Sequence, residues 1–171
     1  MKTLYILSDS TAVGQYVTIH KTWPVLLSQH LEGRYIVQNV SRNGETSRQA
    51  LERLYPDVLR YEPDLIYIQY GSNDANKWET DRGHPRIFPD EFEANMFSIV
   101  KRCWNFGVKV ILGSNHTGAY NHIFEVAHSV DYLVEHNYNN YDYLMSDGVH
   151  LNELGHQLYF ENIARLMDEI S

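Results

Sequence analysis

Polar clusters that could carry acyl-transfer chemistry recur along this chain, and most of them follow short apolar runs. The first, "SDST" (8–11), comes directly after the run "TLYIL" near the start of the sequence. The others are "SRNGETS" (41–47), "GSNDAN" (71–76), "GSNHTG" (113–118) and "SDGVH" (146–150). Each cluster taken alone is ordinary turn or helix-cap composition. Their repetition in one pattern predicts a shared site.

Three side chains in these clusters form a candidate catalytic triad. A serine hydroxyl is a weak nucleophile until a base removes its proton, and an imidazole suits that task. The imidazole needs a carboxylate that fixes its tautomer and stabilises its positive charge. Ser10, His150 and Asp147 supply these groups, because Asp147 stands three residues before His150 and can fold back onto it. These three are the predicted catalytic residues.

Three hydrogen-bond donors in the same clusters form a candidate oxyanion hole. The tetrahedral intermediate of acyl transfer carries a negative oxygen that needs preorganised donors. Gly44 has no Cβ, so its backbone N–H can approach closely. Asn73 offers a side-chain amide, and the backbone N–H of Ser10 completes the predicted hole.

Apolar runs and helical patterns alternate along the chain. The runs predict strands at 3–7, 35–40, 64–70 and 108–113, and the patterns predict helices at 22–31, 46–60, 89–106 and 153–170. This alternation is typical of an α/β fold with a mainly parallel sheet and helices on both faces. Residues 119–143 fit either a helix followed by a short fifth strand or a helix throughout. Ligands bind at the carboxyl ends of the strands in such sheets, so the clusters should share one edge.

The composition is that of a soluble globular protein, and it argues against several classes. With 171 residues, 43% of them hydrophobic and 21% charged, the chain fits a single domain spanning 1–171. A net charge of −8 without a basic run argues against a nucleic-acid partner. No stretch approaches the roughly 18 apolar residues of a membrane span, and no signal cleavage site follows the start. The lone Cys103 reads as core packing and fits a reducing compartment, so we expect a cytoplasmic protein without a membrane partner.

The blocks "SDST", "NGETS", "GSND" and "DGVH", in this order and at these spacings, resemble the SGNH (GDSL-type) hydrolase family. The residues that give the family its letters fall on Ser10, Gly44, Asn73 and His150, and Asp147 matches the acid of its Asp-x-x-His element. The resemblance spans residues 4 to about 160. It implies a flavodoxin-like three-layer α/β/α domain that cleaves esters or thioesters without a metal.

One departure from the family pattern concerns the first block. The glycine that usually opens it is Ser8 here, so Ser8 and Ser10 are both nucleophile candidates. We choose Ser10 because it follows the aspartate, as the family's nucleophile does. No Gly-x-Ser-x-Gly elbow occurs, which argues against the α/β-hydrolase arrangement.

The predicted reaction is removal of a small acyl group, most simply acetyl, from a carbohydrate. The chain has no insertion large enough for a deep acyl tunnel, and the loop 74–88 is polar and aromatic, which suits a sugar. The stretches "DSTAVGQY" and "NVSRNGETSR" also resemble the opening of the rhamnogalacturonan acetylesterase branch. Asp9, Trp78 and His116 are the expected substrate-binding residues, and a homo-oligomer is left open.

Several other functions stay open at this point. A lysophospholipase or thioesterase acting on short acyl chains fits the same residues, as does acyl transfer to a sugar. A catalytically silent sugar-binding or nucleotide-binding module is a further alternative, but no phosphate-cradling glycine motif follows a strand. A metal hydrolase is disfavoured, because the spacings of the nine histidines match no standard zinc pattern. We therefore expect neither a metal nor a cofactor.

Overall fold

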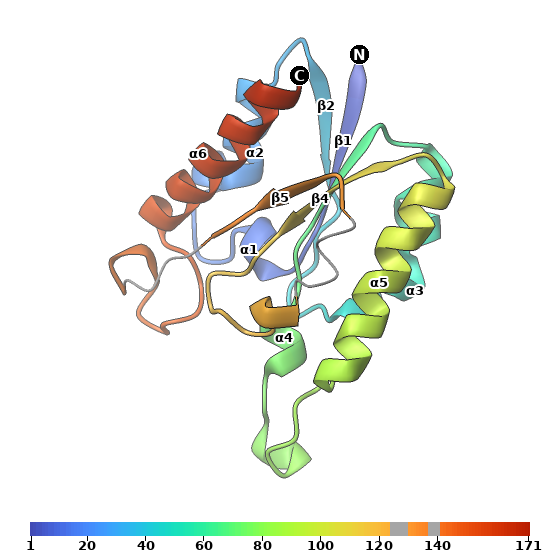
Figure 1. The fold of residues 1–171 in the computed structure, drawn as a ribbon. Helices are drawn as coiled ribbons and strands as arrows, with labels where there is room; N and C mark the ends of the chain where they lie inside the picture. The colour runs from blue at the N-terminus through green and yellow to red at the C-terminus, as the bar shows by residue number, and fades with distance from the viewer. Residues whose placement is uncertain (124–129, 137–140) are drawn as a thin grey trace.

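Five parallel strands form the centre of the fold in a computed structural model that describes residues 1–123, 130–136 and 141–171. The strands are β1 (Lys2–Leu7), β2 (Tyr35–Asn39), β3 (Leu65–Ile68), β4 (Lys109–Gly113) and β5 (Tyr132–Val134). Their order across the sheet is β2-β1-β3-β4-β5, and every neighbouring pair is parallel (Figure 1). This is the flavodoxin-like strand order, and it confirms the predicted fold class.

The central strands are buried on both faces. All four residues of β3 are buried, and so are the last four of β4. In the register, Leu65 of β3 pairs with Leu4 on one side and Lys109 on the other. A near-continuous apolar run is what a parallel strand covered by helices on both faces requires.

Two pairs of helices cover the sheet and complete three layers. α2 (Trp23–His30) packs beside α6 (Glu153–Ile170) on one face, and α3 (Ser47–Asp57) packs beside α5 (Pro89–Asn105) on the other (Figure 1). Each face has its own apolar core. Among the described residues, none of the helices is long and apolar enough to cross a membrane.

The helix boundaries agree closely with the predicted patterns, with one exception. α6 occupies the predicted range, and the Asn152 side chain caps it by accepting the backbone N–H of Gly155 at 3.0 Å. α3 was expected to reach residue 60, but it ends at Asp57 and a 3₁₀ turn, η2 (Leu59–Tyr61), follows. Pro56 lies inside the helix, and the Val58 N–H still bonds the Leu54 carbonyl at 3.1 Å; α3 ends because Val58 leaves the helical conformation, with φ −131° and ψ −68°.

The weakly patterned region 119–143 contains the short fifth strand of the first alternative. β5 (Tyr132–Val134) pairs with β4 at the sheet edge, so a helix throughout this region is wrong. Residues 124–129 and 137–140, where the remainder of that prediction falls, lie outside the described residues.

The single cysteine lies in the core, as predicted. Cys103 on α5 is fully buried in the apolar cluster between α5, α3 and the sheet. Burial raises the pKa of its thiol to about 12, because a thiolate would lose its hydration there. The thiol is therefore protonated and unreactive at neutral pH.

The Tyr67 side chain on β3 lies so close to Gly113, at the end of β4, that this position requires a glycine. A Cβ added to Gly113 would overlap the hydroxyl group of Tyr67 on the neighbouring strand β3. The Tyr67 ring is fully buried, lies 5.2 Å from the Trp23 ring, and its hydroxyl pairs with Nε2 of His136 at 3.0 Å. Because these contacts hold the tyrosine, it cannot move aside without breaking them.

Gly113→Ala should therefore lower the free energy of unfolding by about 1 to 3 kcal/mol, the usual cost of overpacking. Urea unfolding followed by tryptophan fluorescence measures this loss. Gln38→Ala on the exposed edge strand β2 is the control, and it should change stability by less than about 0.5 kcal/mol. An unchanged urea midpoint for Gly113→Ala would contradict the close approach.

Candidate active site

A cavity of about 460 Å³ lies at the carboxyl edge of the sheet. Its walls come from the ends of β1, β3 and β4 and from the segment before α6. Six of the eight predicted site residues line it: Asp9, Ser10, Asn73, His116, Asp147 and His150. Gly44 and Trp78 are not among the described residues that line this cavity. Residues near the two ends of the chain are thus brought together.

The two nucleophile candidates of the first block have different environments. Ser8 is fully buried, and its hydroxyl donates to Oε1 of Gln69 at 3.3 Å. Ser10 is partly exposed, lines the cavity, and begins the short helix α1 (Ser10–Val13). Only Ser10 of the two can therefore reach a substrate.

Helix α1, which carries Ser10, is held from two sides. The indole Nε1 of Trp23 donates to the Thr11 carbonyl at 3.0 Å, and Nδ2 of Asn39 donates to the Ala12 carbonyl at 2.8 Å. A helix of one turn leaves its carbonyls without intrahelical partners, so these bonds satisfy them. They also fix the position of Ser10 relative to β2 and α2.

Asp9 connects the nucleophile segment to Asn73. One carboxylate oxygen of Asp9 accepts the backbone N–H of Thr11 at 2.9 Å and caps α1, and the other accepts Nδ2 of Asn73 at 3.0 Å. Asn73 stands in the short helix α4 (Ser72–Ala75) after β3. An amide nitrogen carries two hydrogens, so Asn73 can donate one to Asp9 and keep one for a ligand in the cavity.

Asp147 and His150 form a hydrogen-bonded pair on the loop before α6. Oδ2 of Asp147 lies 2.7 Å from Nδ1 of His150, while Oδ1 accepts the backbone N–H groups of Val149 and His150 at 2.9 and 3.0 Å. The hydrogen bond from His150 is the main cause that lowers the pKa of Asp147 to about 2. An ionised Asp147 accepts from Nδ1–H of neutral His150, which leaves Nε2 as the basic nitrogen.

His116 holds the loop of Asp147 and His150 in place through hydrogen bonds inside the fold. Its Nε2 donates to the Val149 carbonyl at 2.6 Å, and its Nδ1 lies 2.9 Å from the hydroxyl of Tyr159 on α6. A carbonyl only accepts, so Nε2 carries the proton and Nδ1 accepts from the tyrosine. Burial lowers the pKa of His116, which keeps the imidazole in this neutral form. The Tyr159 hydroxyl also accepts Nε2 of Gln69 at 2.9 Å, which links the loop to the residue that directly follows β3.

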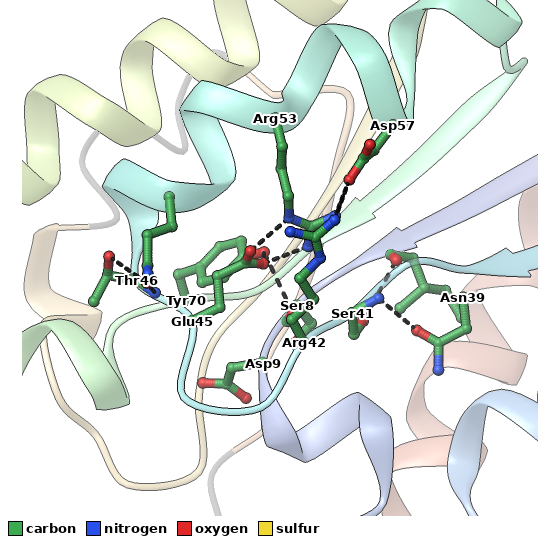
Figure 2. A network of polar contacts seen from close by, with 12 residues as sticks. Ser8, Asp9, Asn39, Ser41, Arg42, Glu45, Thr46, Arg53, Asp57 and Tyr70 are labelled. Carbon is green, nitrogen blue, oxygen red and sulfur yellow. Dashed lines mark hydrogen bonds and ion pairs between the residues drawn. The ribbon is translucent and has the colours of Figure 1, made fainter.

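The turn that contains Gly44 rests on a buried ion pair (Figure 2). The Arg53 guanidinium on α3 binds both carboxylate oxygens of Glu45, and the Tyr70 hydroxyl donates to Oε2 of Glu45 at 2.6 Å. Burial alone would lower the pKa of Arg53, but its hydrogen bonds to Glu45 raise it above the ordinary value. The Tyr70 hydroxyl also lies 3.3 Å from the Ser8 carbonyl, so the network reaches the end of β1.

Gly44 itself is exposed and has a φ of +69°, a left-handed backbone that favours glycine. Its carbonyl accepts Nη1 of Arg86 at 2.8 Å, and the same guanidinium lies over the Trp78 ring at 5.0 Å. Trp78 is 49% exposed. The predicted oxyanion donor Gly44 and the predicted sugar-binding Trp78 are thus connected through Arg86.

The family model described as GDSL-like Lipase/Acylhydrolase family matches residues 9–129, which is most of the chain. The chain belongs to the GDSL-like lipase/acylhydrolase family. It is accordingly a carboxylic ester hydrolase, as its residue pattern predicts. The Asp147–His150 pair lies beyond the matched residues, so its place in the site depends on the geometry described above.

Individual relatives of this GDSL-like hydrolase agree with the family assignment. Thioesterase 1/protease 1/lysophospholipase L1 of Escherichia coli (strain K12) is 25% identical over 164 residues, covering 88% of this chain and 76% of that protein. The esterase EstA from Pseudoalteromonas sp. superposes with a TM-score of 0.79 at 20% identity, covering 99% of this chain and 98% of that one. A mutant acetylxylan esterase, Axe2 from Geobacillus stearothermophilus, has a TM-score of 0.79 at 18% identity over 96% of this chain and 93% of that one.

Several residues that shape this GDSL-like site were not predicted. Gln69 comes directly after β3 and is fully buried, and a polar residue at the end of an apolar run is a signal that a polar side chain is needed inside the fold. Glu45 and Arg53 are eight residues apart across a turn and a helix, and nothing in that spacing predicts that they pair. Tyr159 looks like any aromatic residue on the apolar stripe of α6, so its hydroxyl contacts have no sequence signal.

Three buried histidines make the stability of the protein depend on pH. Burial lowers the pKa of His136 to about 3 and that of His156 to about 4, and it lowers the pKa of His116 as well. Each ring is neutral in the fold, whereas in the unfolded chain it protonates near pH 6.5. The stability that these rings contribute is complete above pH 6.5 and is lost as the pH falls toward their folded pKa values.

We therefore predict that the free energy of unfolding falls as the pH drops below 6.5, with a slope that approaches about 1.4 kcal/mol per pH unit for each of His136 and His156. His156→Gln should reduce this slope by one histidine's share, because a glutamine oxygen can still accept the Trp23 backbone N–H that His156 Nδ1 accepts at 3.2 Å. Urea unfolding at pH 7, 6 and 5 measures it, with His20→Gln on the exposed turn η1 (Ile19–Lys21) as control. Equal slopes for His156→Gln and wild type would refute the assignment.

Proposed function

We propose that this protein is a serine esterase that removes a small acyl group, most simply acetyl, from a carbohydrate through an acyl-enzyme intermediate. The observation that carries the proposal is the 2.7 Å contact between Asp147 and His150, in a cavity that Ser10 also lines. A carboxylate, an imidazole and an accessible hydroxyl at one cavity are the groups that nucleophilic acyl transfer needs.

The proposed reaction starts at Ser10. Nε2 of His150 takes the proton from the Ser10 hydroxyl as its oxygen attacks the ester carbonyl, and Asp147 stabilises the imidazolium that forms. His150 then gives the proton to the leaving alcohol, which leaves an acyl group on Ser10. Water, activated by His150, attacks the acyl carbonyl in the second half, and the acid and free Ser10 are released.

The oxyanion is held by two donors at the cavity in this proposal. They are the backbone N–H of Ser10 and the second amide hydrogen of Asn73, whose first hydrogen bonds Asp9. Because Asp9 fixes the amide before substrate arrives, little reorganisation is needed in the transition state. Gly44 stays a predicted third donor, on the turn that Arg86 holds.

Support for a small acyl group on a sugar comes from several sides. Ten of the thirteen residues that line the cavity have polar side chains, while most of the surface that they expose there is apolar, so the cavity offers both hydrogen-bond partners and apolar contact to a small acylated sugar. Trp78 offers an exposed ring two residues beyond Asn76, which lines the cavity, and the acetylxylan esterase neighbour acts on an acetylated polysaccharide by its name. The second candidate, a short-chain thioesterase or lysophospholipase, is supported by the name of the Escherichia coli relative. Cytoplasmic location and a homo-oligomer stay predictions.

Ser10→Ala should abolish hydrolysis of p-nitrophenyl acetate and labelling by a fluorophosphonate probe, because the attacking oxygen is removed. Ser8→Ala is the matched control: its hydroxyl is buried against Gln69, so most of the activity should remain. Substantial turnover by a folded Ser10→Ala protein, or loss of labelling only in Ser8→Ala, would overturn the proposal. Circular dichroism confirms that each variant is folded.

The substrate class is tested by an acyl-length series of p-nitrophenyl esters beside acetylated xylo-oligosaccharides. We expect kcat/KM to be highest for acetyl and to fall steadily with longer chains, and acetate to be released from the sugars. A maximum at longer acyl chains, with no release from sugars, would favour the thioesterase or lysophospholipase alternative.

Asn73→Ala should lower kcat about a hundredfold with little change in KM, because it removes a donor that acts on the transition state. The reduction in kcat is measured at saturating p-nitrophenyl acetate. Asn105→Ala, at the exposed end of α5, is the control and should match wild type. A merely twofold loss in Asn73→Ala would remove Asn73 from the oxyanion hole.

A further inference from the structure

Tyr16 contacts the imidazole that the proposed mechanism uses as its base. The rings of Tyr16 and His150 meet edge to face, with centroids 5.3 Å apart and planes at 89°. Tyr16 is nevertheless 66% exposed, so little of its surface is covered by the fold. An exposed tyrosine that turns its ring onto a catalytic histidine calls for an explanation other than core packing.

The backbone at Tyr16 is strained in a way that presents this ring. Residues 14–17 form a turn closed by a hydrogen bond from the Val17 N–H to the Gly14 carbonyl at 3.1 Å. Tyr16 is the third residue of this turn and has a φ of +71°, a conformation that normally falls to glycine or asparagine. Gly14 is packed so tightly on Thr22 that an added Cβ would overlap it, which fixes where the turn starts.

We propose that Tyr16 is a positioning residue for His150, an inference that rests on the proposed function. Asp147 holds only the Nδ1 edge of the ring, and a single hydrogen bond leaves the imidazole free to pivot about that edge. The Tyr16 ring blocks this motion from a second direction. A fixed base matters because reacting atoms must be held within a fraction of an ångström of the productive geometry.

Asp147 and His150 are both partly exposed, which explains why a contact from Tyr16 is useful for holding the His150 ring. The side chain of Asp147, the group that orients the ring, is 40% exposed, and that of His150 is 20% exposed, so the open side of the ring has room for a contact from outside the interior. His116 fixes the backbone of the loop through the Val149 carbonyl, so it acts on the loop and not directly on the His150 ring. The tyrosine therefore adds, from the neighbouring segment, the side contact that burial would otherwise give.

Three substitutions of Tyr16 separate the effect of the aromatic ring from the effect of the strained backbone. Tyr16→Phe keeps the ring, Tyr16→Ala removes the ring but keeps a Cβ at positive φ, and Tyr16→Gly removes both. We expect Phe to keep most of the wild-type kcat for p-nitrophenyl acetate, and Ala and Gly to lower it roughly tenfold with KM within about twofold. Gly should unfold at a higher urea concentration than Ala and wild type, because it relieves the strain.

Several outcomes would overturn the inference. A wild-type kcat in Tyr16→Ala, a rise in KM with kcat unchanged, or recovery of kcat in Tyr16→Gly each exclude a role of the ring in orienting the base. Tyr55→Ala, an exposed tyrosine on α3 whose ring lies beside Phe106, is the control and should not change kcat.

A double-mutant cycle with His150 separates this inference from the proposed function. If Tyr16 acts through the imidazole, then adding Tyr16→Ala to His150→Ala should cause no further loss of the residual activity. A further tenfold loss would show that Tyr16 acts elsewhere. An active His150→Ala protein would overturn the proposed function itself, whereas an inactive His150→Ala beside a fully active Tyr16→Ala would overturn only the role of Tyr16.

Discussion

The hydrogen bond between the carboxylate of Asp9 and the amide of Asn73 ties the ends of β1 and β3 together, and the rest of the site is built around it. The same carboxylate caps α1 through Thr11, so one buried group sets both the start of the nucleophile helix and the orientation of the amide. Burial raises the pKa of Asp9, and the hydrogen bonds from Thr11 and Asn73 oppose that shift. Asp9, which was expected to bind substrate, thus serves as a structural connector within the site.

The fold could be predicted from the sequence because its signals are local. Continuous apolar strands, a proline and two acids opening α5, and the asparagine cap of α6 each fix an element without knowledge of its neighbours. The end of α3 was predicted three residues too late, because the backbone turn at Val58 has no local signal in the sequence. The short β5 could not be fixed because three residues at a sheet edge carry too little periodicity to outweigh a helical alternative.

For the site as well, the residues with local sequence signals could be predicted, and those without such signals could not. Ser10, Asp147 and His150 were predicted to meet because parallel strands bring their carboxyl ends to one edge, and that edge now holds a cavity that all three line. The contacts that hold these residues in place join side chains that are far apart in the sequence. Such contacts cannot be deduced from the pattern of a single sequence. The contact of Arg86 with the Gly44 carbonyl and that of Tyr16 with His150 are examples.

Cys103 is buried in the core between α3 and α5, and its thiol is protonated. We therefore expect the folded protein not to react with maleimides and similar thiol reagents. A cysteine introduced on the polar segment around Trp78 would then be the only reactive thiol to which a fluorophore could be attached. A dye there would sit close in sequence to Asn76, which lines the cavity, and it could report the arrival of an ester in real time without any change to the interior.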